Sequence, residues 1–139
     1  MCSPRVVEVE DGHIYFRMHP AVRKAYSRAI DTPKEAAEAG YRAEADLEEG
    51  DGIDVGGYRI YRKGNRICTD RSLTAGNDRE CRMQFETPEM KMGGHVEILV
   101  DSNLIEVFVN DGEYVISNAV YGIGNEIVSD RKVKLFTVE

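Results

Sequence analysis

The chain has 139 residues, of which 42% are hydrophobic and 31% charged, which is typical of one globular domain that buries its own core. The 18 Lys and Arg residues against 25 Asp and Glu give a formal net charge of −7, which argues against nucleic acid or an anionic membrane as partner, because both require a basic surface. The three cysteines have no metal-type spacing, so we expect a cytoplasmic protein with reduced thiols.

The N-terminal part predicts a hairpin followed by a short helix. Val6–Glu10 and His13–Met18 alternate in polarity and flank an Asp-Gly pair, a dipeptide typical of hairpin turns. The following segment is rich in Ala, Glu, Lys and Arg, and Pro33 suits the first turn of a helix. We therefore expect a helical insertion near Thr32–Ala39 that ends at Gly40.

The rest of the chain predicts short strands that are separated by turn residues. An acidic, glycine-bearing loop is expected at Glu48–Gly57. The expected strands are Tyr41–Asp46, Tyr58–Lys63, Arg66–Asp70, Arg79–Glu86, His95–Asp101, Leu104–Asn110, Glu113–Val120 and Arg131–Val138. This spacing predicts an all-β fold, with residues 1–139 forming one two-sheet antiparallel β-sandwich of the jelly-roll or concanavalin-like kind.

The strand Leu104–Asn110 carries apolar residues on both faces. The alternation places Ile105, Val107 and Val109 on one face, and Leu104, Glu106 and Phe108 on the other. Such a strand is either central in the core or covered on its outer side by a loop, a helix or a partner. Glu106, between apolar neighbours, needs a buried partner such as an arginine.

No arrangement of residues in the sequence predicts a catalytic centre. Acidic residues are so plentiful that pairs such as Asp51 with Asp54 are typical of solvated surface. The three histidines lack the spacing of zinc ligands, and no nucleophile stands beside a base. We therefore predict no catalytic, cofactor-binding or metal-binding residues.

Several motifs give the chain a family resemblance. Val96–Ser102 and Ile105–Glu113 resemble the C-terminal β-sandwich of glycoside hydrolase family 32, the group of invertase, levanase and sucrose-6-phosphate hydrolase. Thr69–Ser72 is similar to the Asp-Arg-Ser segment of that module. Ser3–Arg5 and Asp11–Tyr15 resemble its Pro-Arg opening and the strand where the sandwich begins. The motif residues expected to have structural roles are Asp70, Arg71, Ser72, Asp101, Glu106, Phe108, Asn110, Asp111 and Gly112.

The chemistry of these motif residues is that of turns and loop caps. Asp111 and Gly112 suit the positive-φ pair of a type I′ hairpin. Asp70 and Arg71 are expected either to form an ion pair or to cap a loop.

The resemblance implies a role without catalysis. Members of the family carry catalysis on a separate N-terminal five-bladed propeller, whose Asn-Asp-Pro-Asn-Gly and Arg-Asp-Pro motifs do not occur in this sequence. Its Glu-Cys motif matches only Glu80-Cys81, which lies well inside the sandwich region. We therefore expect an accessory C-terminal module of a β-fructosidase-like enzyme that braces a propeller and is inactive alone.

Two other functions are consistent with the sequence. The chain could be a stand-alone lectin-like domain that binds fructose-containing sugars such as fructan or sucrose, with Tyr58, Tyr61 and Tyr121 as the nearest candidate contacts. It could also be an assembly module that binds a copy of itself. The expected partners are therefore the catalytic propeller, a second copy, or a sugar.

Overall fold

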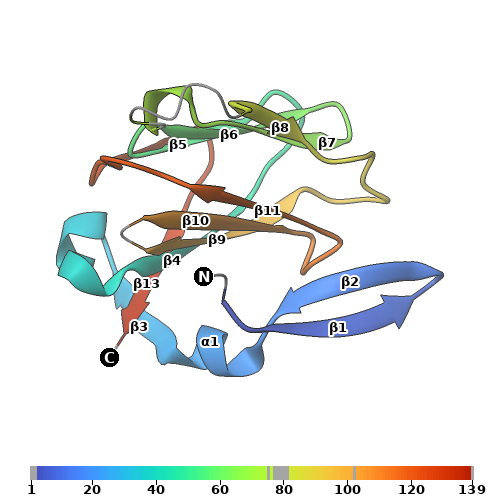
Figure 1. Cartoon of the computed structure of the whole chain (residues 1–139), viewed down its shortest axis with the longest axis horizontal. Helices are drawn as coiled ribbons and strands as arrows, with labels where there is room; N and C mark the ends of the chain where they lie inside the picture. The colour runs from blue at the N-terminus through green and yellow to red at the C-terminus, as the bar shows by residue number, and fades with distance from the viewer. Residues whose placement is uncertain (1–2, 75, 77–81, 102, 139) are drawn as a thin grey trace.

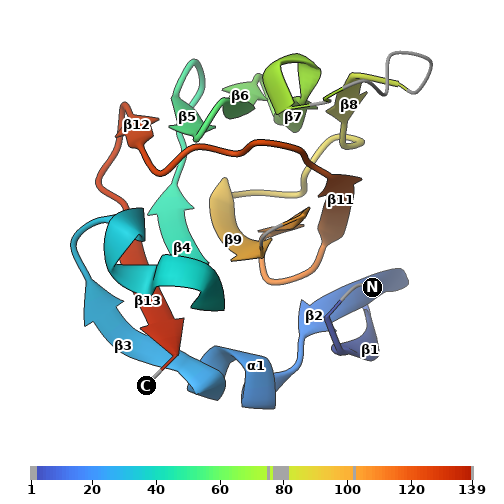
Figure 2. The same ribbon diagram turned by 60° about the vertical axis from the view of Figure 1, so that its left-hand side comes forward.

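Two antiparallel sheets packed face to face, with a separate hairpin at one end, form the architecture of the chain (Figures 1 and 2). The computed structural model describes residues 3–74, 76, 82–101 and 103–138. The six-stranded sheet has the order β11 (Tyr114–Ala119), β10 (Leu104–Val109), β9 (His95–Asp101), β4 (Tyr41–Asp46), β13 (Lys134–Val138) and β3 (Tyr26–Ile30). This arrangement confirms the predicted β-sandwich.

The second sheet has five strands, and the hairpin has two. The five-stranded sheet has the order β12 (Ile127–Ser129), β5 (Gly52–Val55), β6 (Tyr58–Lys63), β7 (Arg66–Asp70) and β8 (Gln84–Glu86). The hairpin pairs β1 (Arg5–Glu10) with β2 (His13–Met18). The helical elements are α1 (Pro20–Ala25) and the 3₁₀ helices η1 (Pro33–Ala39) and η2 (Ser72–Thr74), and no helix in the described part of the chain has the length and apolarity needed to cross a membrane.

The main core lies between the two sheets, where one face of each strand is apolar. The six-stranded sheet contributes Val96, Ile98 and Val100 of β9, and Ile105, Val107 and Val109 of β10. The five-stranded sheet contributes Ile53, Val55, Tyr58, Ile60 and Ile67. Since these residues recur at every second position along their strands, their period of two defines which face of each sheet points inward.

Three strands lie where the sequence did not predict them. The segment expected as a loop contains β5, whose Ile53 and Val55 are buried while Asp54 between them is half-buried. The element β3 pairs with β13, and β12 pairs with β5. Each of the three has five residues or fewer, so its alternation is too short to stand out from an acidic or Ala-rich background.

The helical insertion lies where it was expected, as the 3₁₀ helix η1. The carboxylate of Glu35 accepts hydrogen bonds from the backbone N–H groups of Asp31 and Thr32, at 2.6 and 2.9 Å. Gly40 ends the element with φ of 80°, and a Cβ there would lie 2.5 Å from the carbonyl oxygen of Val100. Only glycine fits this close approach to β9.

Candidate functional site

The outer face of the six-stranded sheet carries a second apolar cluster beneath the N-terminal part of the chain. Leu99 of β9 and Phe108 of β10 point away from the main core and are buried against Met18 of β2. Residues packed around this cluster are Val22, Tyr26 and Val115. The apolar outer face that the sequence predicts for β10 is therefore covered by the end of the hairpin, by α1 and by the start of β3 (Figure 2).

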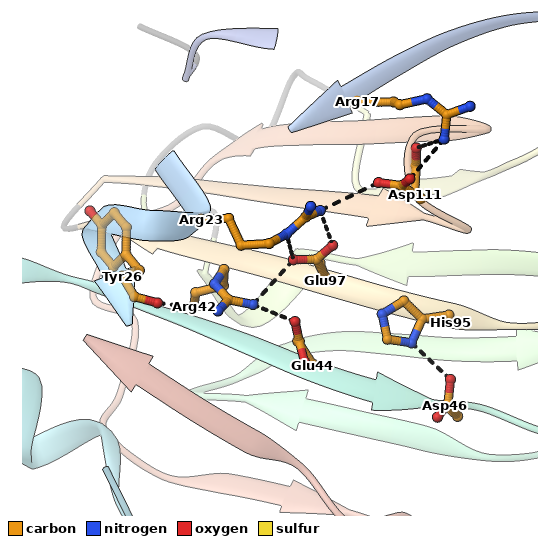
Figure 3. A network of polar contacts seen from close by, with 9 residues as sticks. All are labelled: Arg17, Arg23, Tyr26, Arg42, Glu44, Asp46, His95, Glu97 and Asp111. Carbon is orange, nitrogen blue, oxygen red and sulfur yellow. Dashed lines mark hydrogen bonds and ion pairs between the residues drawn. The ribbon is translucent and has the colours of Figure 1, made fainter. Parts of the chain in front are cut away.

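Buried charges surround this cluster, and Glu97 of β9 is at the centre of one group (Figure 3). Arg23 of α1 donates from Nη2 to Oε1 at 2.6 Å and from Nε to Oε2 at 3.1 Å. Arg42 of β4 donates from Nη1 to Oε2 at 3.2 Å. The hydrogen bond to Glu97 raises the pKa of Arg23, which stays cationic. One carboxylate therefore ties α1 to two adjacent strands of the sheet.

The buried guanidinium of Arg42 has several further partners. It contacts the carboxylate of Glu44, donates to the carbonyl oxygen of Tyr26 at 3.2 Å, and lies 4.5 Å above the ring of Phe136. This combination of a carboxylate, a carbonyl and an aromatic face stabilises a charge that has been removed from water, although the buried Nε of Arg42 has no hydrogen-bond partner among the described residues.

Asp111, in the turn after β10, connects the buried charges to the hairpin. Its carboxylate accepts from Arg23 at 3.3 Å and from Arg17 of β2 at 2.7 Å (Figure 3). Arg17 also pairs with Glu10 at 2.6 Å and with Glu8 at 3.4 Å. The hairpin is thus attached to the sheet through a continuous series of ion pairs.

Glu106 of β10 is the second buried carboxylate on the outer face. Arg5 of β1 pairs with it at 2.8 Å, which is the arginine partner that the sequence predicts. Ser3 adds hydrogen bonds from its backbone N–H at 2.9 Å and from its hydroxyl at 3.2 Å. Arg5 also donates to the hydroxyl of Ser117 at 2.9 Å. The first residues of the hairpin are therefore held on β10.

The turn between β10 and β11 spans residues 110–113 and is longer than the expected two-residue hairpin. The positive φ values predicted for Asp111 and Gly112 are confirmed at 56° and 99°, and Asn110 has φ of 48° as well. The carbonyl of Gly112 accepts from the backbone N–H of Phe16 at 2.9 Å. The turn therefore differs from a two-residue type I′ turn in its length, and it contacts the N-terminal hairpin.

The side chain of Asn110 organises the neighbouring loop. Its Oδ1 accepts from the backbone N–H of His95 at 3.1 Å, and its Nδ2 donates to Met92 O at 2.8 Å and to Glu113 Oε1 at 2.9 Å. The buried Glu113 also accepts from the backbone N–H of Lys91 at 2.9 Å. The side chains of Asn110 and Glu113 therefore hold backbone groups of the neighbouring loop in place.

The Asp-Arg-Ser segment lies on the other sheet, where β7 leads into η2. Asp70 accepts from the backbone N–H of Ser72 at 2.9 Å and from its hydroxyl. Asp70 therefore caps a loop, which is one of the two alternatives that the sequence allowed. The buried Arg71 donates from Nε to Arg82 O at 2.9 Å. Asp101 is exposed at the end of β9, so the motif residues fall on separate parts of the sandwich and do not form one site.

The cap at Asp70 predicts that the stability of the chain depends on pH. The hydrogen bond from the Ser72 hydroxyl holds the pKa of Asp70 below its ordinary value, so its stabilising contribution is complete above about pH 4 and is lost as pH falls through the lower folded pKa. Asp70→Asn keeps an acceptor and removes the charge. We expect its thermal midpoint to lie below that of the parent chain at pH 7, and the difference to shrink as the pH falls below about 4. A midpoint difference that is constant from pH 7 to pH 3 would contradict this assignment.

The tyrosines proposed as sugar contacts do not share an exposed groove. Tyr58 is fully buried and donates from its hydroxyl to Asn118 Oδ1 at 2.6 Å, and burial raises its pKa to about 12. The prediction for Tyr58 is therefore wrong, because this strand faces the main core. Tyr61 is half-buried beside Arg59, and Tyr121 is exposed beyond β11, so both remain only predictions.

Glu44, His95 and Glu97 are the metal-type cluster among the described residues, with candidate ligand atoms within 4.8 Å of one another. The cluster arises because β4 and β9 are adjacent, a proximity that residue spacing does not reveal. Glu97 is already engaged by two arginines, and His95 Nδ1 lies 2.8 Å from Asp46 Oδ1 (Figure 3). We therefore interpret the cluster as part of the ion-pair network.

A groove of about 840 Å³ lies between the hairpin and the sandwich. Ile14 and Phe16 of β2 line one part of it, and Val115 of β11 and residues 85–88 line another. Arg5 lies in its wall together with His13, whose Nε2 donates to the carbonyl of Glu113 at 2.6 Å. The walls combine apolar side chains with polar groups that are already hydrogen-bonded within the chain.

Sequence reasoning missed the arginines that carry this site. Arg5 is separated from its carboxylate by 101 residues, Arg17 by 94, Arg23 by 74 and Arg42 by 55. The only available signal was the buried position of Glu97 and Glu106 on apolar strands, which indicates that cationic partners exist but not which residues they are.

Comparisons with known proteins agree with this architecture. Residues 19–138 match the family described as "Glycosyl hydrolases family 32 C terminal". A levanbiose-producing levanase from Bacillus subtilis (strain 168) is 34% identical over an alignment of 92 residues, and the match covers 63% of this chain and 17% of the levanase.

Solved structures share the fold over nearly the whole chain. A sucrose-6-phosphate hydrolase from Lactobacillus gasseri superposes with a TM-score of 0.74 at 17% identity, covering 97% of this chain and 33% of that chain. A glycoside hydrolase family 32 protein from Bifidobacterium adolescentis has the same TM-score of 0.74 at 22% identity, with coverages of 99% and 25%. The chain thus spans about a third or less of the length of these relatives, and by its match over residues 19–138 it belongs to glycosyl hydrolase family 32 as the C-terminal β-sandwich.

Proposed function

We propose that the chain is an accessory module that stabilises the catalytic domain of a β-fructosidase-type family 32 enzyme and does not itself cleave sugars. The observation that carries this proposal is that the chain corresponds to only part of the length of two solved structures. It covers 33% of the sucrose-6-phosphate hydrolase from Lactobacillus gasseri and 25% of the family 32 protein from Bifidobacterium adolescentis. The rest of each relative has no counterpart among these 139 residues.

The chemistry of the carboxylates supports the same proposal. A retaining glycosidase needs two carboxyl groups about 5–5.5 Å apart that both reach the sugar. Glu97 and Glu106 are buried on the outer face and bound by arginines, and Glu113 is buried and bound by backbone and amide groups. These groups hold structure together and are not available to a substrate.

The absence of hydrolysis is directly measurable. We expect the purified chain to release no fructose or glucose from sucrose, sucrose-6-phosphate or levan above the buffer background. Turnover by the parent chain that disappears on Glu113→Gln, in a protein that remains folded, would contradict the proposal.

If the chain stabilises a catalytic domain, adding the chain raises the temperature at which that domain loses activity. The probe is the catalytic region of the Bacillus subtilis levanase without the segment that matches this chain. Binding to the folded state stabilises a protein by about 2.7 kcal/mol when the free ligand is at 100 times Kd. We therefore expect the inactivation temperature of the probe to rise with the concentration of added chain. An inactivation temperature that does not change at any concentration would argue against an accessory role.

A further inference from the structure

Arg59 of β6 is an exposed cation whose N–H groups have no acceptor within the described part of the chain. It forms no hydrogen bond and no ion pair there, whereas each of the other described arginines donates to at least one oxygen. Even Arg28, which is exposed on the edge strand β3, donates from Nε to Val138 O at 3.4 Å. Acidic residues outnumber basic ones by 25 to 18, so a shortage of carboxylates does not explain the state of Arg59.

The register of the five-stranded sheet places Arg59 between two carboxylates. It lies opposite Asp54 of β5 on one side and opposite Asp70 of β7 on the other. Tyr58 and Ile60, which flank Arg59 along the strand, are buried in the main core. Because successive side chains of a strand point to opposite faces, Arg59 and the two carboxylates share the outer face of the sheet. Directly opposite residues on one face are neighbours in space.

Both carboxylates are held in orientation by the turns that follow their strands. Asp54 Oδ1 accepts from the backbone N–H of Gly57 at 2.8 Å, and Asp70 Oδ1 accepts from that of Ser72 at 2.9 Å. Asp70 Oδ2 accepts from the side-chain amide of Gln84 at 3.3 Å, and Asp54 Oδ2 has no hydrogen-bond partner among the described residues. A carboxylate has more acceptor positions than these contacts use, so both groups can still accept from a ligand.

The ring of Tyr61 holds the guanidinium of Arg59 from the same strand and the same face. The Cζ atom of Arg59 lies 5.7 Å from the ring centroid, within the range of a cation–π contact. The residues opposite Tyr61 are Gly52 and Cys68, so neither adjacent strand places a large side chain beside the ring. The ring orients the guanidinium without using any of its N–H donors.

One class of ligand matches these donors and acceptors. It must accept from Arg59 and donate to the two carboxylates, and a hydroxyl group does both. Two adjacent hydroxyl oxygens of a sugar can accept from the planar fork of a guanidinium. An anion would be repelled by the two carboxylates, and a cation by Arg59. A depression of about 370 Å³ adjoins the carboxylate of Asp54 and gives room for further sugar units.

We propose that Asp54, Arg59, Tyr61 and Asp70 form a binding site for a neutral oligosaccharide, which we call the Arg59 site. Arg59 donates to adjacent hydroxyl oxygens, Asp54 and Asp70 accept from hydroxyl groups, and Tyr61 positions Arg59. The five-stranded sheet that carries the site lies on the opposite side of the main core from α1 and the second apolar cluster (Figure 1). The site is therefore separate from the ion pairs that hold the hairpin, and the inference does not depend on the stabilising role.

The test compares two matched variants. Arg59→Lys keeps the positive charge and removes the planar fork of donors. Arg28→Lys is the control, because it makes the same change at an exposed arginine of the other sheet. Both variants should unfold within a few degrees of the parent chain, since neither side chain is buried.

Binding of levan fragments and of maltohexaose, which are neutral oligomers of fructose and of glucose, is measured by titration calorimetry. We expect the parent chain to bind at least one of them, Arg59→Lys to bind it about tenfold more weakly, and Arg28→Lys to bind as the parent does. No binding of either oligomer by the parent chain, or equal binding by Arg59→Lys, would overturn the site. Tighter binding of sucrose-6-phosphate than of sucrose would assign the site to an anion and would also overturn the proposal.

Nuclear magnetic resonance of the backbone amides shows where the saccharide binds. We expect its addition to shift the amide signals of β5, β6 and β7, and to leave those of α1 and of the β1–β2 hairpin unchanged. Shifts that are confined to the hairpin and the groove beside it would overturn the Arg59 site. Failure of the site would leave the stabilising role standing, because the inactivation temperature of the levanase probe tests that role independently.

Discussion

Glu97→Ala is expected to reduce the free energy of unfolding by about 3–5 kcal/mol, among the largest effects of any substitution in the chain. The carboxylate is buried and accepts from two arginines, one of which, Arg42, is itself buried on β4. Removing it leaves cationic groups beneath α1 without their main partner. Denaturant unfolding of the variant against the parent chain measures the loss.

The control is Glu44→Ala, which removes a carboxylate that also contacts Arg42 but is half-buried. Because solvent screens such a pair, its loss is expected to cost about 1 kcal/mol or less. If Glu97→Ala costs no more than this control, Glu97 does not hold the network together. Pairing Glu97→Ala with Arg23→Ala in a double-mutant cycle then gives the coupling energy between β9 and α1.

Gly112→Ala is expected to cost about 2–4 kcal/mol, because two effects add at this position. The residue has φ of 99°, a conformation that side chains other than glycine rarely adopt. A Cβ there would also lie 2.6 Å from the carbonyl carbon and oxygen of Phe16, so the hairpin backbone must move. We expect faster hydrogen exchange in β2 as well as a lower thermal midpoint.

Gly12→Ala separates these two effects. Gly12 is in the β1–β2 turn with φ of 77°, and a Cβ there would have no heavy atom within 4 Å. Its substitution carries only the conformational cost, about 1–2 kcal/mol. A Gly112→Ala variant that matches Gly12→Ala in stability and in β2 exchange would show that the contact between the turn and the hairpin is unimportant.

The parts of the fold that could be predicted are the strands in which inward-facing apolar residues recur at every second position over six or seven residues. The alternation of β9 and β10 extends over seven and six residues, so it identified both the strands and their inward faces. The four residues of β5 hold only two apolar side chains in an acidic context, and this strand is evident only from its pairing with β6 and β12. Short strands are defined by their neighbours in space, which a single sequence does not show.

The candidate site also contains some contacts that the sequence could predict and others that it could not. The need for a partner at Glu106 followed from its apolar neighbours on one strand, and Arg5 supplies it. The hydrogen bonds of Asp70 to Ser72 span two residues, so a cap there could also be anticipated. The bonds of Arg23 and Arg42 to Glu97 span 74 and 55 residues and depend on how α1 and β4 pack, which no spacing rule encodes.

Because Met18 and Arg5 lie on the outer face, the start of the family match is not the start of the segment that the fold needs. The family match starts at residue 19, but a chain that began there would lack the side chain that covers Leu99 and Phe108 and the cation that neutralises Glu106. The smallest piece expected to fold cooperatively therefore includes a segment that lies outside the family's defining region. If this sandwich were exchanged between enzymes, the hairpin would have to be transferred with it. Otherwise the recipient enzyme would have to supply other residues that cover the outer face of β9 and β10.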